Sequence, residues 1–157
     1  YVQSYFIAAH HLRRTQEAME FLAQRLRRFG KRSGFPARTL SWAYEQTGQS
    51  PEALDVLRQA IELRPDDGEL LLYVSEAFAR HGDFAEAARL LKQVEGKAPT
   101  TQWQRGAALI AAYQGELQRS LSLWQAVVEA EPLAIDANRN VAQLLAETSS
   151  HETALEF

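Results

Sequence analysis

Residues 68–100 read GELLLYVSEAFARHGDFAEAARLLKQVEGKAPT, and the pattern of this segment indicates how the chain folds. Gly82 in its middle and Pro99 near its end divide it into two lengths of about 12–14 residues, which suits helices. Within each length apolar residues recur at spacings of three and four, the pattern of a helix that buries one face. The stretch therefore predicts two helices joined by a tight turn.

Helix-ending glycine and proline residues recur along the chain at the same spacing. Gly48, Gly82 and Gly115 are separated by 34 and 33 residues, and each precedes a proline by 17 residues. The three prolines are Pro65, Pro99 and Pro132. Helix stops at so regular an interval indicate a repeated helix–turn–helix unit.

Aligning the units on these stops brings residues of similar size into register. Small residues form one column in the first helix of each unit: Ser41, Ser75, Ala108 and Ala142. A second small column runs through the second helices: Ala53, Ala87, Ser120 and Ala154. Large apolar residues follow in the second helices: Leu57, Leu91 and Trp124. Small residues let two helices approach closely while large ones fill the adjacent space, so the columns predict paired helices with a shared core.

The columns resemble the tetratricopeptide repeat, a 34-residue pair of antiparallel helices. Residues 34–67 carry the family's pattern at Leu40, Tyr44, Gly48, Ala53, Leu57, Ala60 and Pro65. The family's early tryptophan is absent throughout, and its glycine in the first helix is Ser or Ala here. The resemblance implies an all-α, right-handed superhelical solenoid of antiparallel helix pairs.

The stops predict five segments. They are a degenerate helix pair with a basic link at 1–33, TPR-like repeats at 34–67, 68–100 and 101–134, and a truncated TPR-like repeat at 135–157. In the first segment we expect Thr15 to N-cap a helix that runs through Phe29. Tyr1 and Phe157 both lie inside apolar helical patterns, which we expect of a piece of a longer array.

The composition excludes several kinds of functional site. The chain has 157 residues, a formal net charge of -3 and no cysteine. Disulfides, thiolate metal sites and cysteine nucleophiles are therefore excluded. The longest apolar run, Gly106 to Tyr113, is far shorter than the roughly 20 residues that span a bilayer, so we do not expect the chain to cross a membrane. The compartment stays open between bacterial periplasm and cytoplasm.

Charge is uneven along the chain. Residues 1–38 hold eight basic and two acidic side chains, whereas residues 39–157 hold nine basic and eighteen acidic ones. The basic patch consists of Arg25, Arg27, Arg28, Lys31 and Arg32. One interpretation is a binding surface for an acidic partner, a membrane or a nucleic acid. A second is a solvated helix face. A third is a basic end of the chain that meets the acidic end of another copy. Because the chain as a whole is acidic, we do not expect nucleic acid.

The resemblance implies that the first helices line a concave face that binds partners. The residues predicted on that face are Arg38, Trp42, Glu76, Arg105, Leu109, Tyr113, Arg139 and Gln143. Arginine forks pair with carboxylates and aromatic rings supply anchoring area, which suits an acidic ligand. Alternatively, these arginines are solvated or pair with Glu45 and Glu76. A family variant that clamps chaperone C-termini uses Asn where Trp42 and Glu76 stand, so we do not expect that function.

No pattern in the chain points to catalysis. His10, His11, His81 and His151 lack the spacing of a shared metal site, and the common nucleotide, hydrolase and zinc-protease motifs are absent. We therefore expect no catalytic residue, cofactor or metal.

The sequence predicts a non-catalytic protein–protein interaction scaffold that binds a partner segment in its groove. One alternative is a periplasmic scaffold of a bacterial exopolysaccharide export machine, which recruits modifying enzymes or guides a charged, acidic polysaccharide. A further alternative is a repeat module attached to an enzyme.

Overall fold

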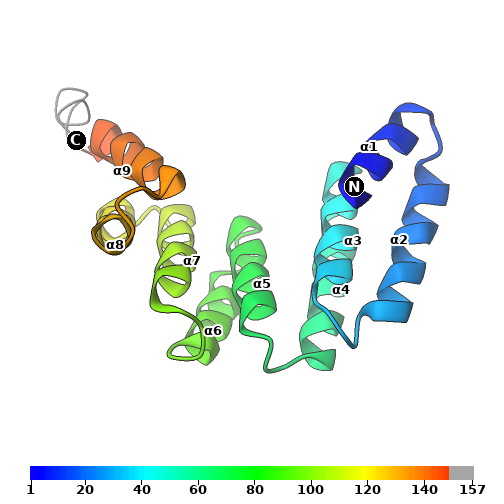
Figure 1. The fold of residues 1–157 in the computed structure, drawn as a ribbon, viewed down its shortest axis with the longest axis horizontal. Coiled ribbons are helices and arrows are strands. Elements are labelled where there is room, and N and C mark those ends of the chain that lie inside the picture. The colour runs from blue at the N-terminus through cyan, green and yellow to red at the C-terminus, as the bar shows by residue number, and fades with distance from the viewer. Residues whose placement is uncertain (149–157) are drawn as a thin grey trace. The chain divides into compact units, whose positions relative to one another are not determined.

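A computed structural model describes residues 1–148, and these residues form helices joined by short turns, with no strand among them (Figure 1). The helices are α1 (Val2–His11), α2 (Thr15–Phe29), α3 (Phe35–Gln46), α4 (Ser50–Leu63), α5 (Gly68–Arg80), α6 (Phe84–Val94), α7 (Thr100–Tyr113), α8 (Leu117–Ala130) and α9 (Ile135–Thr148). The predicted all-α solenoid of helix pairs is thereby confirmed. The chain forms two compact units, Tyr1–Val74 and Ser75–Phe157, and the division falls inside α5.

The repeating glycines follow the first helices because the turn there needs a residue with positive φ. Gly82 after α5 has φ +84°, and Gly115 after α7 has φ +78°. An L-amino acid with a side chain rarely adopts this left-handed conformation, whereas glycine does so without steric cost. In each turn the following amide bonds back to a carbonyl inside the helix, as Glu116 N–H does to Ala111 at 2.9 Å. The chain therefore reverses at the places that the glycine spacing predicted.

Aspartate side chains cap the N-termini of α5 and α6. The amide of Glu86 donates to Asp83 Oδ1 at 3.2 Å at the start of α6. The amide of Leu70 donates to Asp67 Oδ1 at 3.1 Å at the start of α5. Each bond satisfies one of the amides that a helix N-terminus leaves without an intrahelical partner.

The expected cap at Thr15 is wrong. Helix α2 begins at Thr15 itself, and the N-cap residue is Arg14, which makes no capping bond through its side chain. The hydroxyl of Thr15 instead lies 2.9 Å from His10 Nδ1 at the end of α1. Arg13, with φ +58°, makes the turn between the two helices. The threonine thus ties α1 to α2 and does not cap α2.

In the N-terminal unit, α1, α2 and α3 share one core. Phe6 from α1, Leu22 from α2 and Leu40 from α3 are almost fully buried together. Ala43 on α3 is also fully buried at this contact. Small side chains on α3 therefore leave room for the large ones that α1 and α2 contribute.

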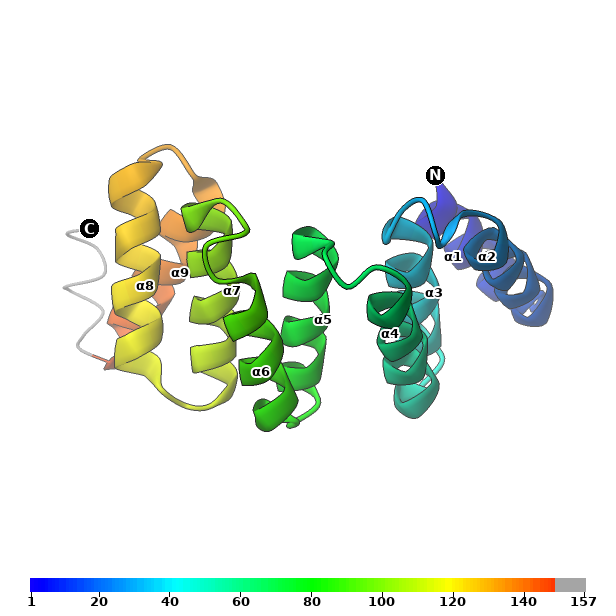
Figure 2. The same cartoon turned by 90° about the horizontal axis from the view of Figure 1, so that it is seen from below.

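In the second unit, α7 and α8 pack side by side (Figure 2), and α9 joins α8. Ala108 on α7, Trp124 on α8 and Val141 on α9 are buried in one cluster. The hydroxyl of Ser120 donates to the carbonyl oxygen of Ala108 at 2.8 Å, which joins the two small-residue columns directly. The columns predicted to be core are buried or partly buried up to Ala142, while Ala154 lies outside the described residues.

We predict that Gly115→Ala lowers the free energy of unfolding by about 1 kcal/mol, because a Cβ at this φ is strained although no atom lies within 4 Å of it. Gly115→Asn should cost less, since asparagine tolerates this conformation better than alanine does. Urea unfolding followed by circular dichroism measures both variants. Equal losses for alanine and asparagine would show that the backbone conformation is not the cause.

Candidate partner-binding surface

Arg38 on α3 is held by two groups from α5. Its Nη1 donates to Glu69 Oε1 at 2.6 Å, and its guanidinium lies 4.5 Å from the ring centroid of Tyr73. The Arg38 side chain is 32% exposed and the Glu69 side chain 77% exposed. The pair therefore joins the first helices of successive helix pairs while leaving the carboxylate open to solvent.

Arg105 on α7 is held more fully, by two carboxylates. Its Nε donates to Asp136 Oδ2 at 2.9 Å, and its Nη2 donates to Glu131 Oε2 at 2.7 Å. Glu131 follows α8 and Asp136 lies in the first turn of α9. The Arg105 side chain is only 23% exposed. One guanidinium thus joins three helices, and we call this arrangement the Arg105 clamp.

The clamp shifts the ionisation of its members. Hydrogen bonds from Arg105 lower the pKa of Asp136 and the pKa of Glu131 below their ordinary values. The same bonds raise the pKa of Arg105, outweighing the opposing effect of burial. All three groups are therefore more firmly charged in the folded chain than in the unfolded one.

Both arginine pairs use a partner 31 residues further along the chain, Glu69 for Arg38 and Asp136 for Arg105. Sequence reasoning looked for partners at Glu45 and Glu76 and missed these carboxylates. The signal that could have found them is the acidic residue in the first turn of the next first helix, which occurs at Glu69 and Asp136. These two arginines link helices that are far apart in the chain.

Two further residues of the predicted surface take part in packing. Trp42 is half-buried and makes an edge contact with the ring of Phe6, with 5.5 Å between the centroids. Leu109 is half-buried and packs against the core of the second unit. Both side chains therefore support the helices that carry the surface.

The other predicted residues lie in the second unit and differ in exposure. Tyr113 at the end of α7 is 41% exposed, and Arg139 and Gln143 on α9 are exposed. Gln143 donates to Glu147 at 3.0 Å. Glu76 on α5 is half-buried and accepts from Arg80 at 3.3 Å. Because the clamp joins α7 to the first turn of α9, Tyr113, Arg139 and Gln143 stand on neighbouring helices.

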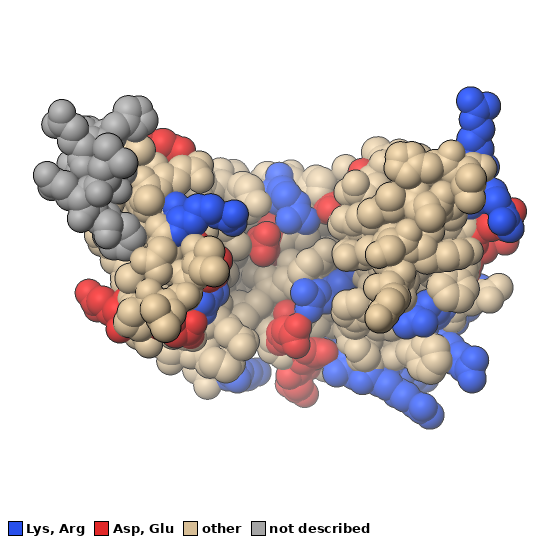
Figure 3. Space-filling model, turned by 45° about the horizontal axis from the view of Figure 1, so that its top comes forward, with Lys and Arg blue, Asp and Glu red and all other residues tan. Residues whose placement is uncertain are grey.

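The basic patch carries aromatic rings that sequence reasoning missed. The guanidinium of Arg25 lies 5.9 Å from the ring centroid of Phe21 and 5.8 Å from that of Phe29. Arg28 lies 5.2 Å from the centroid of Phe29. The signal was the four-residue spacing of Phe21, Arg25 and Phe29, which aligns them along one helix face. Figure 3 shows basic side chains along the lower edge of the end that carries α1 and α2.

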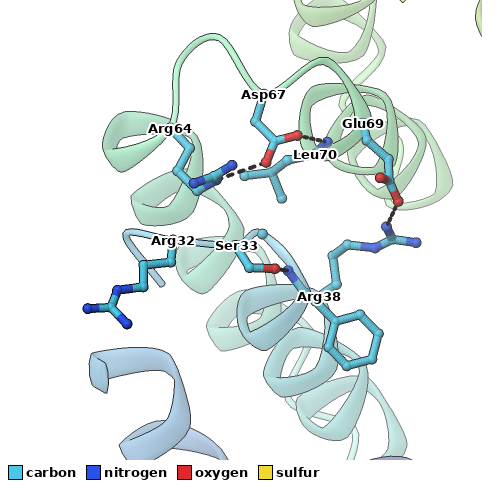
Figure 4. Close-up of a pocket in the computed structure, with 9 residues that line it drawn as sticks. Arg32, Ser33, Arg38, Arg64, Asp67, Glu69 and Leu70 are labelled. Atoms are coloured by element: carbon cyan, nitrogen blue, oxygen red, sulfur yellow. Dashed lines mark hydrogen bonds and ion pairs between the residues drawn. The ribbon is translucent and has the colours of Figure 1, made fainter. Parts of the chain in front are cut away.

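A pocket of about 370 Å³ opens beside this patch, where the α2–α3 link meets the turn between α4 and α5 (Figure 4). We call it the corner pocket. Its lining consists of Arg32, Ser33, Gly34, Phe35, Arg38, Arg64, Asp67, Glu69 and Leu70. Arg64 donates to Asp67 at 2.8 Å and to the carbonyl oxygen of Lys31 at 3.0 Å, so it fixes the link against the turn.

Gly34 and Asp67 shape the wall of the corner pocket. A Cβ at Gly34 would lie 3.1 Å from two carbons of Leu70 and 3.3 Å from a carboxylate oxygen of Asp67, so glycine permits the close approach. Burial raises the pKa of Asp67, but the bonds from the Leu70 amide and from Arg64 outweigh it and leave the pKa lowered. The pocket wall is therefore charged and rigidly held.

Within residues 1–148, no group of three or more His, Asp or Glu side chains is arranged to hold a metal ion. Over the same range, every helix is too short or too polar to cross a bilayer.

Successive helix pairs joined by tight turns define a helical-repeat protein. The family model described as tetratricopeptide repeat matches residues 38–100 and 105–157, which is more than half of the chain. The chain therefore belongs to the tetratricopeptide repeat family.

The chain is similar to several known members. The mouse (Mus musculus) interferon-induced protein with tetratricopeptide repeats 3 is 34% identical over 80 residues, which is 50% of this chain and 20% of that protein. A tetratricopeptide repeat protein from Parabacteroides merdae matches 99% of this chain and 60% of its own, with a TM-score of 0.76 and 13% identity. MamA from Desulfovibrio magneticus matches 99% and 88%, with a TM-score of 0.65 and 17% identity. The structural likenesses concern the fold, and this chain spans a fifth of the curated mouse relative.

We predict that Arg105→Met lowers the free energy of unfolding by about 1 kcal/mol, because it removes bonds that join three helices at a partly buried site. The matched control is Arg119→Met, which breaks an exposed pair with Glu116 inside one helix turn. Urea unfolding should show a change for the control within about 0.5 kcal/mol. A control loss as large as that of Arg105→Met would contradict the clamp.

The clamp should also make stability depend on pH. Asp136 and Glu131 have ordinary pKa values of 3.8 and 4.5, and the folded chain lowers both. A lowered carboxyl pKa gives stability that is present above the unfolded value and is lost as pH falls through the folded value. The difference in unfolding free energy between wild type and Arg105→Met should therefore stay constant above about pH 5 and shrink below about pH 4. A difference that persists undiminished to about pH 2 would contradict this origin.

Proposed function

We propose that this chain is a non-catalytic scaffold that binds a segment of a partner protein on the exposed face of its first helices. The proposal rests on the exposure of Tyr113, Arg139 and Gln143 on two helices that the Arg105 clamp links. These exposed side chains stand on α7 and α9, whose relative placement the Arg105 clamp holds. A rigid pair of helices can present contacts to a partner with little loss of conformational entropy.

The predicted residues divide into two roles in this proposal. Tyr113 is the anchor, because an aromatic ring offers a large contact area with few rotatable bonds. Arg139 supplies a cation, since the structure gives it no carboxylate partner among residues 1–148. Arg105, Leu109 and Trp42 hold the helices that carry the contacts. Substitutions in the two sets should therefore act differently, the first on binding and the second on stability.

A non-catalytic role agrees with the family, whose members are typically interaction scaffolds. The exposed groups of the surface are an aromatic ring, a guanidinium and an amide, which are side chains suited to contacts with a protein segment. Affinity would arise from several weak contacts of this kind along the partner segment.

The test places a photo-crosslinking amino acid at Tyr113 in one bait and at Arg119 on α8 in another. Both baits are exposed to a lysate of the source organism, irradiated, and analysed by mass spectrometry. We expect a protein segment that crosslinks to position 113 and not to position 119. In a plain capture, Tyr113→Ala/Arg139→Glu should reduce recovery of that protein by about tenfold, a typical loss for an interface anchor.

The charge-reversal control is Arg119→Glu, whose side chain is 60% exposed on α8. It should leave recovery unchanged, because it lies on a second helix. Equal recovery by all baits would place binding on another face and contradict the proposal. Crosslinking of an acidic polysaccharide to position 113, with no protein segment, would contradict it in favour of the glycan-guiding alternative.

A further inference from the structure

The corner between α2 and α3 combines three features in one place. The first is charge, since Arg25, Arg27, Arg28, Lys31 and Arg32 have no carboxylate partner among the ion pairs of residues 1–148. The second is the run of rings and guanidinium groups along α2. The third is the corner pocket, which begins at Arg32. Basic side chains, aromatic rings and the corner pocket thus follow one another along α2 and the α2–α3 link.

The corner pocket already binds a carboxylate from the chain itself. Glu69 accepts from Arg38 at 2.6 Å at the pocket wall, yet its side chain is 77% exposed. An exposed ion pair contributes little free energy, so another carboxylate can replace Glu69 at small cost. The Arg32 side chain extends away from both bound carboxylates, Asp67 and Glu69 (Figure 4). Its cation is therefore available to a second acidic group.

We propose that this corner is a docking site for an acidic segment of a partner protein. One carboxylate of the segment enters the corner pocket and pairs with Arg38 or Arg32, and an adjacent apolar side chain rests on Phe35, which is 54% exposed. Further carboxylates pair with the guanidinium groups on α2. Stacking against Phe21 and Phe29 holds these groups in place, which reduces the entropy lost when a carboxylate binds.

A protein segment fits these observations better than a nucleic acid or a membrane does. Bases stack on open ring faces, but guanidinium groups of Arg25 and Arg28 already lie over Phe29. A bilayer surface is broad, whereas a pocket of about 370 Å³ suits one or two side chains. Peptide carboxylates stand on separate flexible side chains, so one can enter the pocket while others reach the α2 face.

The inference rests on the proposed scaffold function but uses a different surface, so the two can fail separately. The probe is a fluorescein-labelled peptide of about twelve residues that repeats Glu-Glu-Leu, with Gln-Gln-Leu as the uncharged control. Fluorescence anisotropy measures binding to the whole chain at low and high salt. We expect the acidic peptide to bind, the control peptide not to bind, and high salt to weaken binding. Amide NMR shifts should fall on residues 28–38 and 64–70.

Two matched pairs of variants locate the site. Arg28→Glu/Arg32→Glu should weaken peptide binding by about tenfold or more, whereas Arg89→Glu/Arg119→Glu makes the same charge change on α6 and α8 and should alter it less than about twofold. Glu69→Gln should tighten binding because it releases Arg38. Glu52→Gln removes an equal charge at the start of α4, the end away from the corner pocket, and should have little effect on peptide binding. Circular dichroism confirms that each variant is folded.

Several results would overturn the inference. They are equal losses for the two arginine pairs, equal gains for the two glutamine variants, and amide shifts outside the corner. Tighter binding at the corner by an oligouridine RNA or by phosphatidylglycerol vesicles than by the peptide would also overturn it. If peptide binding fails while crosslinking at Tyr113 succeeds, only this inference falls. If the peptide binds and the crosslink fails, only the proposed function falls.

Discussion

The close approach of paired helices at small side chains is the constraint on which the structure depends. A single helix pair has an apolar face that it cannot bury by itself, so each pair needs a neighbour. At the α7–α8 contact, Ala108 and Ser120 are fully buried and joined by a hydrogen bond of 2.8 Å. A larger side chain at either position would separate the helices and expose Trp124. Tight helix packing therefore also sets where the surface residues stand.

Electrostatics adds order to this packing. Arg38 and Arg105 each reach from one first helix to an acidic residue at the start of the next. These pairs link helices that are far apart in the chain. They also distinguish two groups of side chains. The paired arginines link helices, while Tyr113, Arg139 and the basic patch remain exposed. Arginine therefore links helices at some positions and stands exposed at others.

The fold could be predicted in detail because its signals are local. Glycine at positive φ, acidic caps and apolar spacing act within a few residues, and they recur at a fixed interval. The exposure of the predicted site residues could not be predicted in this way, since residues on one helix face differ in what covers them. Trp42 lies against Phe6 from a helix about 36 residues earlier, a contact that no local pattern reveals. The proposed repeat boundaries and site residues remain predictions.

Periodic spacing and turn chemistry depend only on neighbouring positions, so the helical class, the tetratricopeptide repeat family and the core columns follow from the sequence. Which arginines are paired, which aromatic rings are covered and where a pocket forms follow only from the folded chain. Those properties depend on side chains that meet after about 30 residues of intervening chain. The corner pocket arises in this way, since its walls come from the α2–α3 link and the α4–α5 turn, which folding brings together.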